Sequence, residues 1–157
     1  MLTVPSSLLE YKPGNVVLLS RTDTSPNVLR VIANNKEKLR IKNASLTIDE
    51  KIVGHKNVIS NALRLDQSQT QEFVETLPNS YTYRIQWPAL PLLSTQTRET
   101  QLGENEAYLL GDNRFSSYDS RQFGAVSESE LRGKVLLVLR AAKENNGIIG
   151  SWIKIFD

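Results

Sequence analysis

The chain has 157 residues and a net charge of +2, with 39% hydrophobic and 23% charged residues. This length suits one domain, or one core with an insertion, and allows a sizeable apolar core. Acidic and basic residues are interspersed without a basic stripe, which argues against nucleic acid as a partner. Because cysteine is absent, disulfides and thiolate metal sites are excluded, and nothing in the sequence predicts another metal site or a cofactor.

The sequence contains no candidate membrane span. A transmembrane helix needs about 18–20 consecutive apolar residues, and the longest apolar run, residues 135–139, has only the length of a strand. The N-terminus also lacks the basic and then apolar pattern of a targeting segment. We therefore expect this chain to be soluble.

Most of the patterned segments predict strands. Residues 1–15 are expected to be irregular, because Pro5, Pro13 and Gly14 discourage regular structure. The segments that follow are short and either apolar or alternating, as strands are. They are residues 16–19, 28–32, 39–42, 46–48, 81–85, 108–110, 134–140 and 148–156, of which the third and fourth predict a hairpin.

The remaining segments are less regular. Residues 58–73 have loosely helical spacing and are interpreted as a short helix or a loop, whereas the polar residues 94–106 are expected to be an exposed excursion. Residues 127–131 contain a Ser-x-x-Glu pattern that predicts one helical turn. Since no ten-residue amphipathic helix stands out, the sequence predicts an all-β or β-dominated fold. His55 lies in a turn-like Gly-His-Lys-Asn sequence, so we expect a solvated loop histidine rather than a member of a Ser-His-Asp triad.

The most polar stretch is residues 111–121, Gly-Asp-Asn-Arg-Phe-Ser-Ser-Tyr-Asp-Ser-Arg. On its own it could be a turn in which Asx and Ser side chains bond the local backbone. As a whole, Gly-Asp-Asn-Arg-x-x-Ser-x-Asp-Ser-Arg, followed by Phe-Gly at 123–124 and Gly-Lys at 133–134, resembles the last signature box of the type I signal peptidases. All fixed positions of that box are present, which makes the match specific. Residues 111–121 are called the signature loop below.

The resemblance implies a family of membrane-anchored endopeptidases that remove signal peptides at the outer face of the cytoplasmic membrane. They use a serine nucleophile and a lysine general base, without a cofactor, on a catalytic β-core with a variable β insertion. In this chain the core would comprise residues 1–48 and 106–157, and the insertion residues 49–105. The implied partners are signal peptides or exported proteins. The implied membrane anchor would precede this segment, so the chain is either a trimmed outer domain or an anchorless relative.

The resemblance places a leucine where the family has its catalytic lysine. The family's lysine box, Lys-Arg-Val-Ile-Gly-Leu-Pro-Gly-Asp, aligns with residues 29–37, Leu-Arg-Val-Ile-Ala-Asn-Asn-Lys-Glu. Residues 12–17, Lys-Pro-Gly-Asn-Val-Val, look like the preceding Gly-Asp box. Arg30 is retained, but Leu29 occupies the lysine position. Because leucine cannot accept a proton, the expected general base is missing.

The family's serine box, Pro-Ser-Gly-Ser-Met-x-Pro-Thr-Leu, fits this chain in two registers. Aligned from its left edge, it puts Ser6 at the oxyanion-donor serine and Leu8 at the nucleophile position. Aligned from its downstream Gly-Asp onto residues 14–15, it puts Ser6 at the nucleophile position. The box could also lie upstream of this segment, in which case Ser6 and Ser7 are plain loop serines.

The signature loop would support the site. By resemblance, Ser117 contacts the lysine position, Asp112 pairs with Arg30, and Asp119 pairs with Arg121. An extended peptide would add alongside the strand around Asn27 and Val28. The complete set of supporting residues is Arg30, Asp112, Asn113, Arg114, Ser117, Asp119, Ser120 and Arg121.

Three interpretations follow. The first is a catalytically degenerate signal peptidase relative that binds or assists exported proteins. The second is an active signal peptidase with a non-standard dyad, in which Lys12 or Lys36 reaches Ser6. The third is an unrelated β-rich interaction domain, which the lack of a pair between Asp112 and Arg30 would favour.

Overall fold

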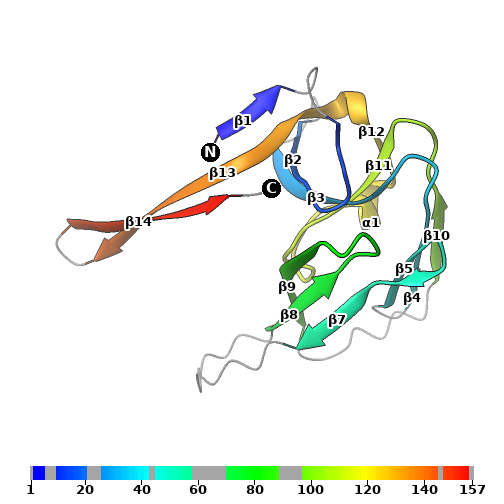
Figure 1. Ribbon diagram of the computed structural model, residues 1–157, viewed down its shortest axis with the longest axis horizontal. Coiled ribbons are helices and arrows are strands. Elements are labelled where there is room, and N and C mark those ends of the chain that lie inside the picture. The colour runs from blue at the N-terminus through cyan, green and yellow to red at the C-terminus, as the bar shows by residue number, and fades with distance from the viewer. Residues whose placement is uncertain are drawn as a thin grey trace.

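The computed structural model describes residues 2–5, 10–20, 26–42, 45–57, 70–88, 97–144 and 147–155. Within these ranges the chain forms three antiparallel sheets and one short α-helix, α1 (Ser120–Phe123) (Figure 1). The β-dominated fold expected from the sequence is confirmed. No helix in the described residues is long and apolar enough to cross a membrane.

The largest sheet joins the two ends of the chain. Its strands follow the order β1-β13-β2-β3-β11-β12, and β14 pairs with β13. Their bounds are β1 (Leu2–Pro5), β2 (Val16–Leu19), β3 (Asn27–Asn34), β11 (Glu106–Leu110), β12 (Val126–Ser127), β13 (Leu131–Glu144) and β14 (Gly147–Ile155). The prediction of an irregular N-terminus was therefore wrong for β1, because β13 supplies a pairing partner more than a hundred residues away.

Two smaller sheets lie beside the large one (Figure 1). The first has the order β10-β4-β5-β6, with β4 (Lys38–Lys42), β5 (Ser45–Ile48), β6 (Lys51–Ile52) and β10 (Arg98–Gln101). The second has the order β7-β8-β9, with β7 (Gly54–Asn57), β8 (Thr70–Thr76) and β9 (Thr82–Pro88). Pairing of β4 with β5 confirms the predicted hairpin.

Several segments differ from the expectations. Residues 70–73, at the end of the segment interpreted as a helix or loop, belong to strand β8, while residues 58–69 lie outside the described part. The polar run 94–106 contains β10, which pairs with β4, and the buried Leu102. The predicted turn at 127–131 is a 3-10 helix, Glu128–Glu130, capped by Ser127.

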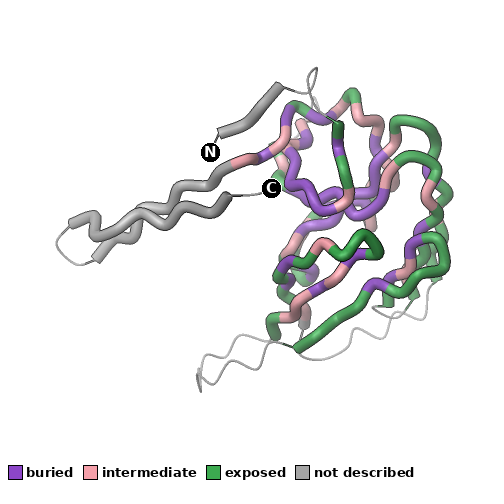
Figure 2. Tube along the Cα trace, viewed as in Figure 1, coloured by how far each residue is buried: buried purple, intermediate pink, exposed green. Residues whose placement is uncertain are grey.

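The central strand β3 is covered on both faces, and most of its residues are buried (Figure 2). Side chains alternate along a strand, so Leu29 and Val31 join one apolar cluster while Ile32 joins the other. The first cluster comprises Tyr11, Val17, Leu19, Leu29, Val31, Ala107, Leu109, Val126 and Leu131. The second comprises Ile32, Ala33, Leu39, Leu46, Ile48, Val53, Leu77, Tyr83, Ile85, Leu102, Tyr108 and Leu110.

Candidate functional site

The signature loop follows β11 and ends in α1, where Asp119 caps the helix. The Asp119 carboxylate accepts from the backbone N–H of Arg121 at 3.1 Å, and the Gln122 side chain accepts from the backbone N–H of Asp119 at 2.8 Å. This reciprocal capping box fixes the return of the chain. The loop closes tightly, because a Cβ atom at Gly111 would collide with the Ser117 side chain.

Asp119 and Arg121 form the pair that the resemblance implied. Arg121 donates from Nε and Nη2 to the two carboxylate oxygens, each at 2.8 Å. Asp119 is fully buried and also accepts from the backbone N–H of Gly111 at 2.9 Å. Arg121 Nη1 donates to the carbonyl oxygen of Arg114 at 2.7 Å. The pair therefore organises the whole loop and is not an exposed local contact.

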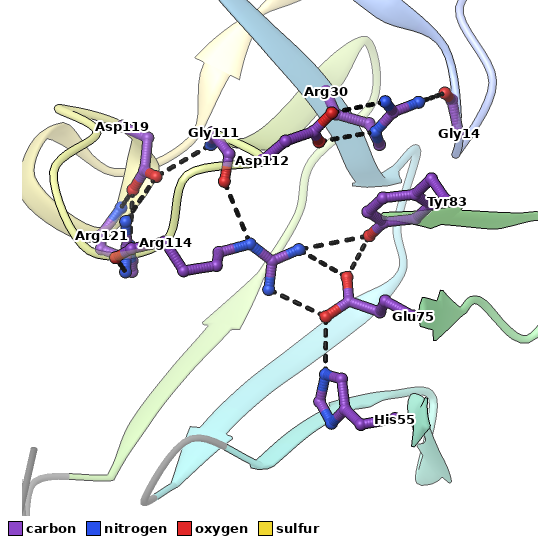
Figure 3. A network of polar contacts seen from close by, with 10 residues as sticks. All are labelled: Gly14, Arg30, His55, Glu75, Tyr83, Gly111, Asp112, Arg114, Asp119 and Arg121. Carbon is purple, nitrogen blue, oxygen red and sulfur yellow. Dashed lines mark hydrogen bonds and ion pairs between the residues drawn. The ribbon is translucent and has the colours of Figure 1, made fainter. Parts of the chain in front are cut away.

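Arg30 and Asp112 also form the expected pair, which links β3 to the signature loop (Figure 3). Arg30 donates from Nε and Nη2 to the Asp112 carboxylate at 2.8 Å and 2.7 Å, and from Nη1 to the Gly14 carbonyl at 2.6 Å. Its guanidinium lies 4.3 Å from the ring centroid of Tyr83. Burial alone would lower the pKa of Arg30, but the hydrogen bonds and charge of Asp112 outweigh it and raise the pKa.

A second buried pair, Arg114 with Glu75, joins the signature loop to strand β8. Arg114 donates to the two Glu75 oxygens at 2.9 Å and 2.5 Å, and its Nε donates to the Gly111 carbonyl at 3.1 Å. Glu75 also accepts from Tyr83 Oη–H and lies 2.6 Å from His55 Nε2. Figure 3 shows all these side chains converging on the Glu75 carboxylate.

Electrostatics keep the buried Glu75 ionised. Burial favours its neutral form, but the hydrogen bond with His55 and the charge and hydrogen bonds of Arg114 prevail and lower its pKa to about 2. For Arg114, burial alone would lower the pKa, yet Glu75 raises it. The two residues are therefore a buried ion pair that ties the β7-β8-β9 sheet to the signature loop.

Sequence reasoning assigned Arg114 to the site but missed Glu75 as its partner. The available signal was the alternation Phe73-x-Glu75-x-Leu77, which puts an acid among inward-facing positions of a strand. The expectation for His55 was wrong about its place, because it lies on strand β7 and not in a loop, but correct about its exposure. Its side chain is 27% exposed and contacts the buried Glu75 carboxylate.

The other predicted residues take separate places. Leu29 is only 4% exposed and packs in the apolar cluster around Val31. Val28 pairs with Leu18 of β2 and is 49% exposed, and Asn27 is partly buried. Ser6, Ser7 and Leu8, on which both registers of the serine box depend, lie outside the described residues.

Of the three remaining loop residues, Asn113 and Ser120 accept hydrogen bonds from backbone N–H groups. Asn113 Oδ1 accepts from the backbone N–H groups of Phe115 and Ser116 at 3.2 Å and 3.3 Å. The buried Ser120 Oγ accepts from the Leu109 N–H at 2.9 Å, which anchors α1 to β11. Ser117 is partly buried beside Gly111. Among the described residues, no group of three or more His, Asp or Glu side chains could hold a metal ion.

The chain is similar to known proteins in sequence and in fold. The sequence model of the family described as signal peptidase, peptidase S26, matches residues 3–140. The chain belongs to this signal peptidase family. A crystal structure of a signal peptidase I from Enterococcus faecalis V583 is similar with a TM-score of 0.50 and 20% sequence identity, covering 81% of this chain and 97% of that chain. At this identity the likeness shows the fold. No curated protein sequence matches the chain.

Proposed function

We propose that this member of the signal peptidase family is catalytically inactive and binds signal peptides or the exported proteins that carry them. The observation that carries the proposal is Leu29, which stands at the position of the family's lysine box where the general base is expected. Amide hydrolysis by a Ser–Lys pair needs a lysine that burial keeps neutral, so that it can take the serine proton. The Leu29 side chain packs among apolar residues and offers no proton acceptor.

The pairs around that position support a role for the scaffold without its chemistry. Arg30, next to Leu29, keeps its bidentate pair with Asp112, and Asp119 keeps its pair with Arg121. Breaking a buried ion pair commonly costs about 3–5 kcal/mol, because one charge is left uncompensated. Folding alone is therefore a sufficient reason to retain the signature loop in a chain that does not cleave peptides.

The edge of β3 supports the proposed peptide site around Asn27 and Val28. β2 pairs with β3 from Asn27 to Arg30, whereas the described pairing with β11 begins at Arg30 and runs to Asn34. Within the described ranges, the side of β3 away from β2 is therefore unpaired before Arg30. An extended peptide can add a strand there through main-chain hydrogen bonds, and the exposed Val28 would lie beside it.

The location and the domain division are also proposed. The family's activity implies the outer face of the cytoplasmic membrane as the place where this protein acts. Residues 1–48 and 106–157 would form the core, because they supply the large sheet, and 49–105 the insertion, because they supply the sheet β7-β8-β9. The two parts share the sheet β10-β4-β5-β6, whose strands come from both.

A second candidate is an active signal peptidase with a non-standard dyad. The retained pairs of Arg30 with Asp112 and of Asp119 with Arg121 favour this candidate, because an active enzyme of the family would contain them too. Its proposed bases, however, lie in exposed ion pairs: Lys12 with Glu10 at 3.1 Å and Lys36 with Glu104 at 2.6 Å. Neither lysine has the desolvated surroundings that disfavour an ammonium. If this candidate were right, Ser6→Ala would abolish cleavage of a signal-peptide substrate.

The proposed function is tested by measuring binding and cleavage of the same peptide. A fluorescent peptide with a hydrophobic stretch and small residues before the cut should bind the chain and remain intact. Val28→Asp should weaken binding, whereas Ile52→Asp, a matched change at an exposed residue on β6, should not. Cleavage of the peptide, or equal binding by both variants, would contradict the proposal.

A further inference from the structure

We propose a second peptide-binding surface on strand β7, separate from the β3 edge, that accepts an extended segment with one large apolar side chain flanked by acidic residues. Judged on the described residues, the surface combines a strand edge without a pairing partner, an adjacent apolar pocket and a cation without an ion pair. It does not depend on the proposed function of the β3 edge, and its occupant is a peptide segment of a partner protein.

The pocket has a volume of about 120 Å³ and is lined by His55, Phe73, Ile85 and Trp87. Three of these side chains are apolar, and the fourth is held in place by the buried Glu75, 2.6 Å from His55 Nε2. A cavity of about 150 Å³ with apolar walls holds a benzene molecule. The pocket on β7-β8-β9 therefore has the size of one aromatic or branched aliphatic side chain.

Strand β7 gives the pocket an open edge. It is the first strand in the order β7-β8-β9, and within the described ranges only β8 pairs with it. All four residues of β7 are exposed. An edge strand presents unpaired N–H and C=O groups that can pair with an extended peptide. The edge would supply affinity through the main chain, and the pocket would supply selection for one side chain.

The alternation of side chains along β7 determines which peptide residues face the pocket and which face Lys56. Since paired residues of antiparallel strands lie on the same face, a peptide residue opposite His55 lies on the pocket's face of the sheet. The next peptide residue, opposite Lys56, lies on the other face. Lys56 is exposed, and no ion pair is found for it in the part of the chain that the structure describes. An acidic residue beside the pocket-filling residue would compensate its charge.

The same cation disfavours a second copy of the chain as the occupant. Antiparallel pairing of two β7 strands in the register that sets Lys56 opposite its own copy would bring the two lysines close together, and like charges opposite each other are destabilising. Lysines on edge strands discourage such self-pairing in many proteins. Prevention of self-pairing would explain Lys56 but not the apolar pocket next to the edge. A peptide with acidic residues and one large apolar side chain would use both the lysine and the pocket.

Three blocked peptides test the surface on the full chain. The first is Thr-Val-Glu-Phe-Glu-Val-Thr, the second replaces its Phe with Ala, and the third carries N-methyl groups on alternate residues. Fluorescence anisotropy should show that the first binds about tenfold or more tightly than the second, because one aromatic side chain is buried. The third peptide should bind no more tightly than the second, because its N-methyl groups prevent the main-chain hydrogen bonds.

Two charge-reversing variants complete the test. Lys56→Glu should weaken binding of the first peptide about threefold, while Lys42→Glu, a matched change at an exposed lysine on β4, should leave it unchanged. Absence of binding at millimolar peptide, or equal binding of the first two peptides, would overturn the proposal. Concentration-dependent dimerisation of the chain that Lys56→Glu alters would overturn it in favour of a second copy.

Discussion

Arg114 and Glu75 are 39 residues apart in the chain, yet the guanidinium donates to both carboxylate oxygens, at 2.9 Å and 2.5 Å. The backbone reinforces this link, because Gln86 on β9 exchanges hydrogen bonds with Asp112 and Arg114 at 2.8 Å each. The signature loop is therefore held from both sides, by Arg30 on the large sheet and by the β7-β8-β9 sheet.

Replacing Glu75 by Gln should destabilise the protein strongly. The change removes the charge opposite the buried Arg114, and breaking such a pair costs about 3–5 kcal/mol. Urea unfolding measures the loss. In the double variant with Arg114→Met the cost should be less than the sum of the two single changes, because no uncompensated charge remains. A loss below about 1 kcal/mol in Glu75→Gln would contradict the role of the pair.

The same pair should make stability depend on acid pH. Because the folded-state pKa of Glu75 is lowered to about 2, its contribution is fully present above its unfolded pKa, near 4.5. It is lost as the pH falls from there through about 2, when the folded protein must also bind the proton. The shift corresponds to about 3 kcal/mol. Unfolding free energies of the parent and Glu75→Gln should therefore converge between pH 4.5 and pH 2, and parallel curves would refute this account.

Gly111→Ala should destabilise the signature loop. The added methyl group would meet the Ser117 side chain, and overpacking of this kind costs about 1–3 kcal/mol. Ser117→Gly removes the obstructing atoms, so the double variant should recover part of the loss despite the added backbone freedom of glycine. Thermal unfolding of the four proteins measures the coupling, and purely additive effects would show that the two side chains do not compete.

Part of this structure could be predicted from the sequence. The strand at residues 16–19 and the hairpin of β4 and β5 carry local apolar patterns and were predicted correctly. Strands β1 and β10 were missed, because a proline-terminated segment and a polar segment become strands only through pairing with β13 and β4. Local patterns do not contain that information.

The candidate site could also be predicted only in part from the sequence. Arg30 with Asp112 and Asp119 with Arg121 followed from motif positions, which fix partners irrespective of local structure. Glu75 was missed because its inward direction follows from a strand whose start lay in a segment interpreted as helix or loop. The position of His55 could not be predicted either, since its partner is that same carboxylate.

The central claim is that the chain lacks the general base because Leu29 replaces a lysine. The most direct measurement is a cleavage assay of a signal-peptide substrate with small residues before the cut, using the parent and Leu29→Lys, with unfolding curves to check that the variant folds. The account predicts no cleavage by the parent and measurable cleavage by the folded variant, in which burial would keep the new amine neutral. Cleavage by the parent would contradict the account, because another residue would then supply the base.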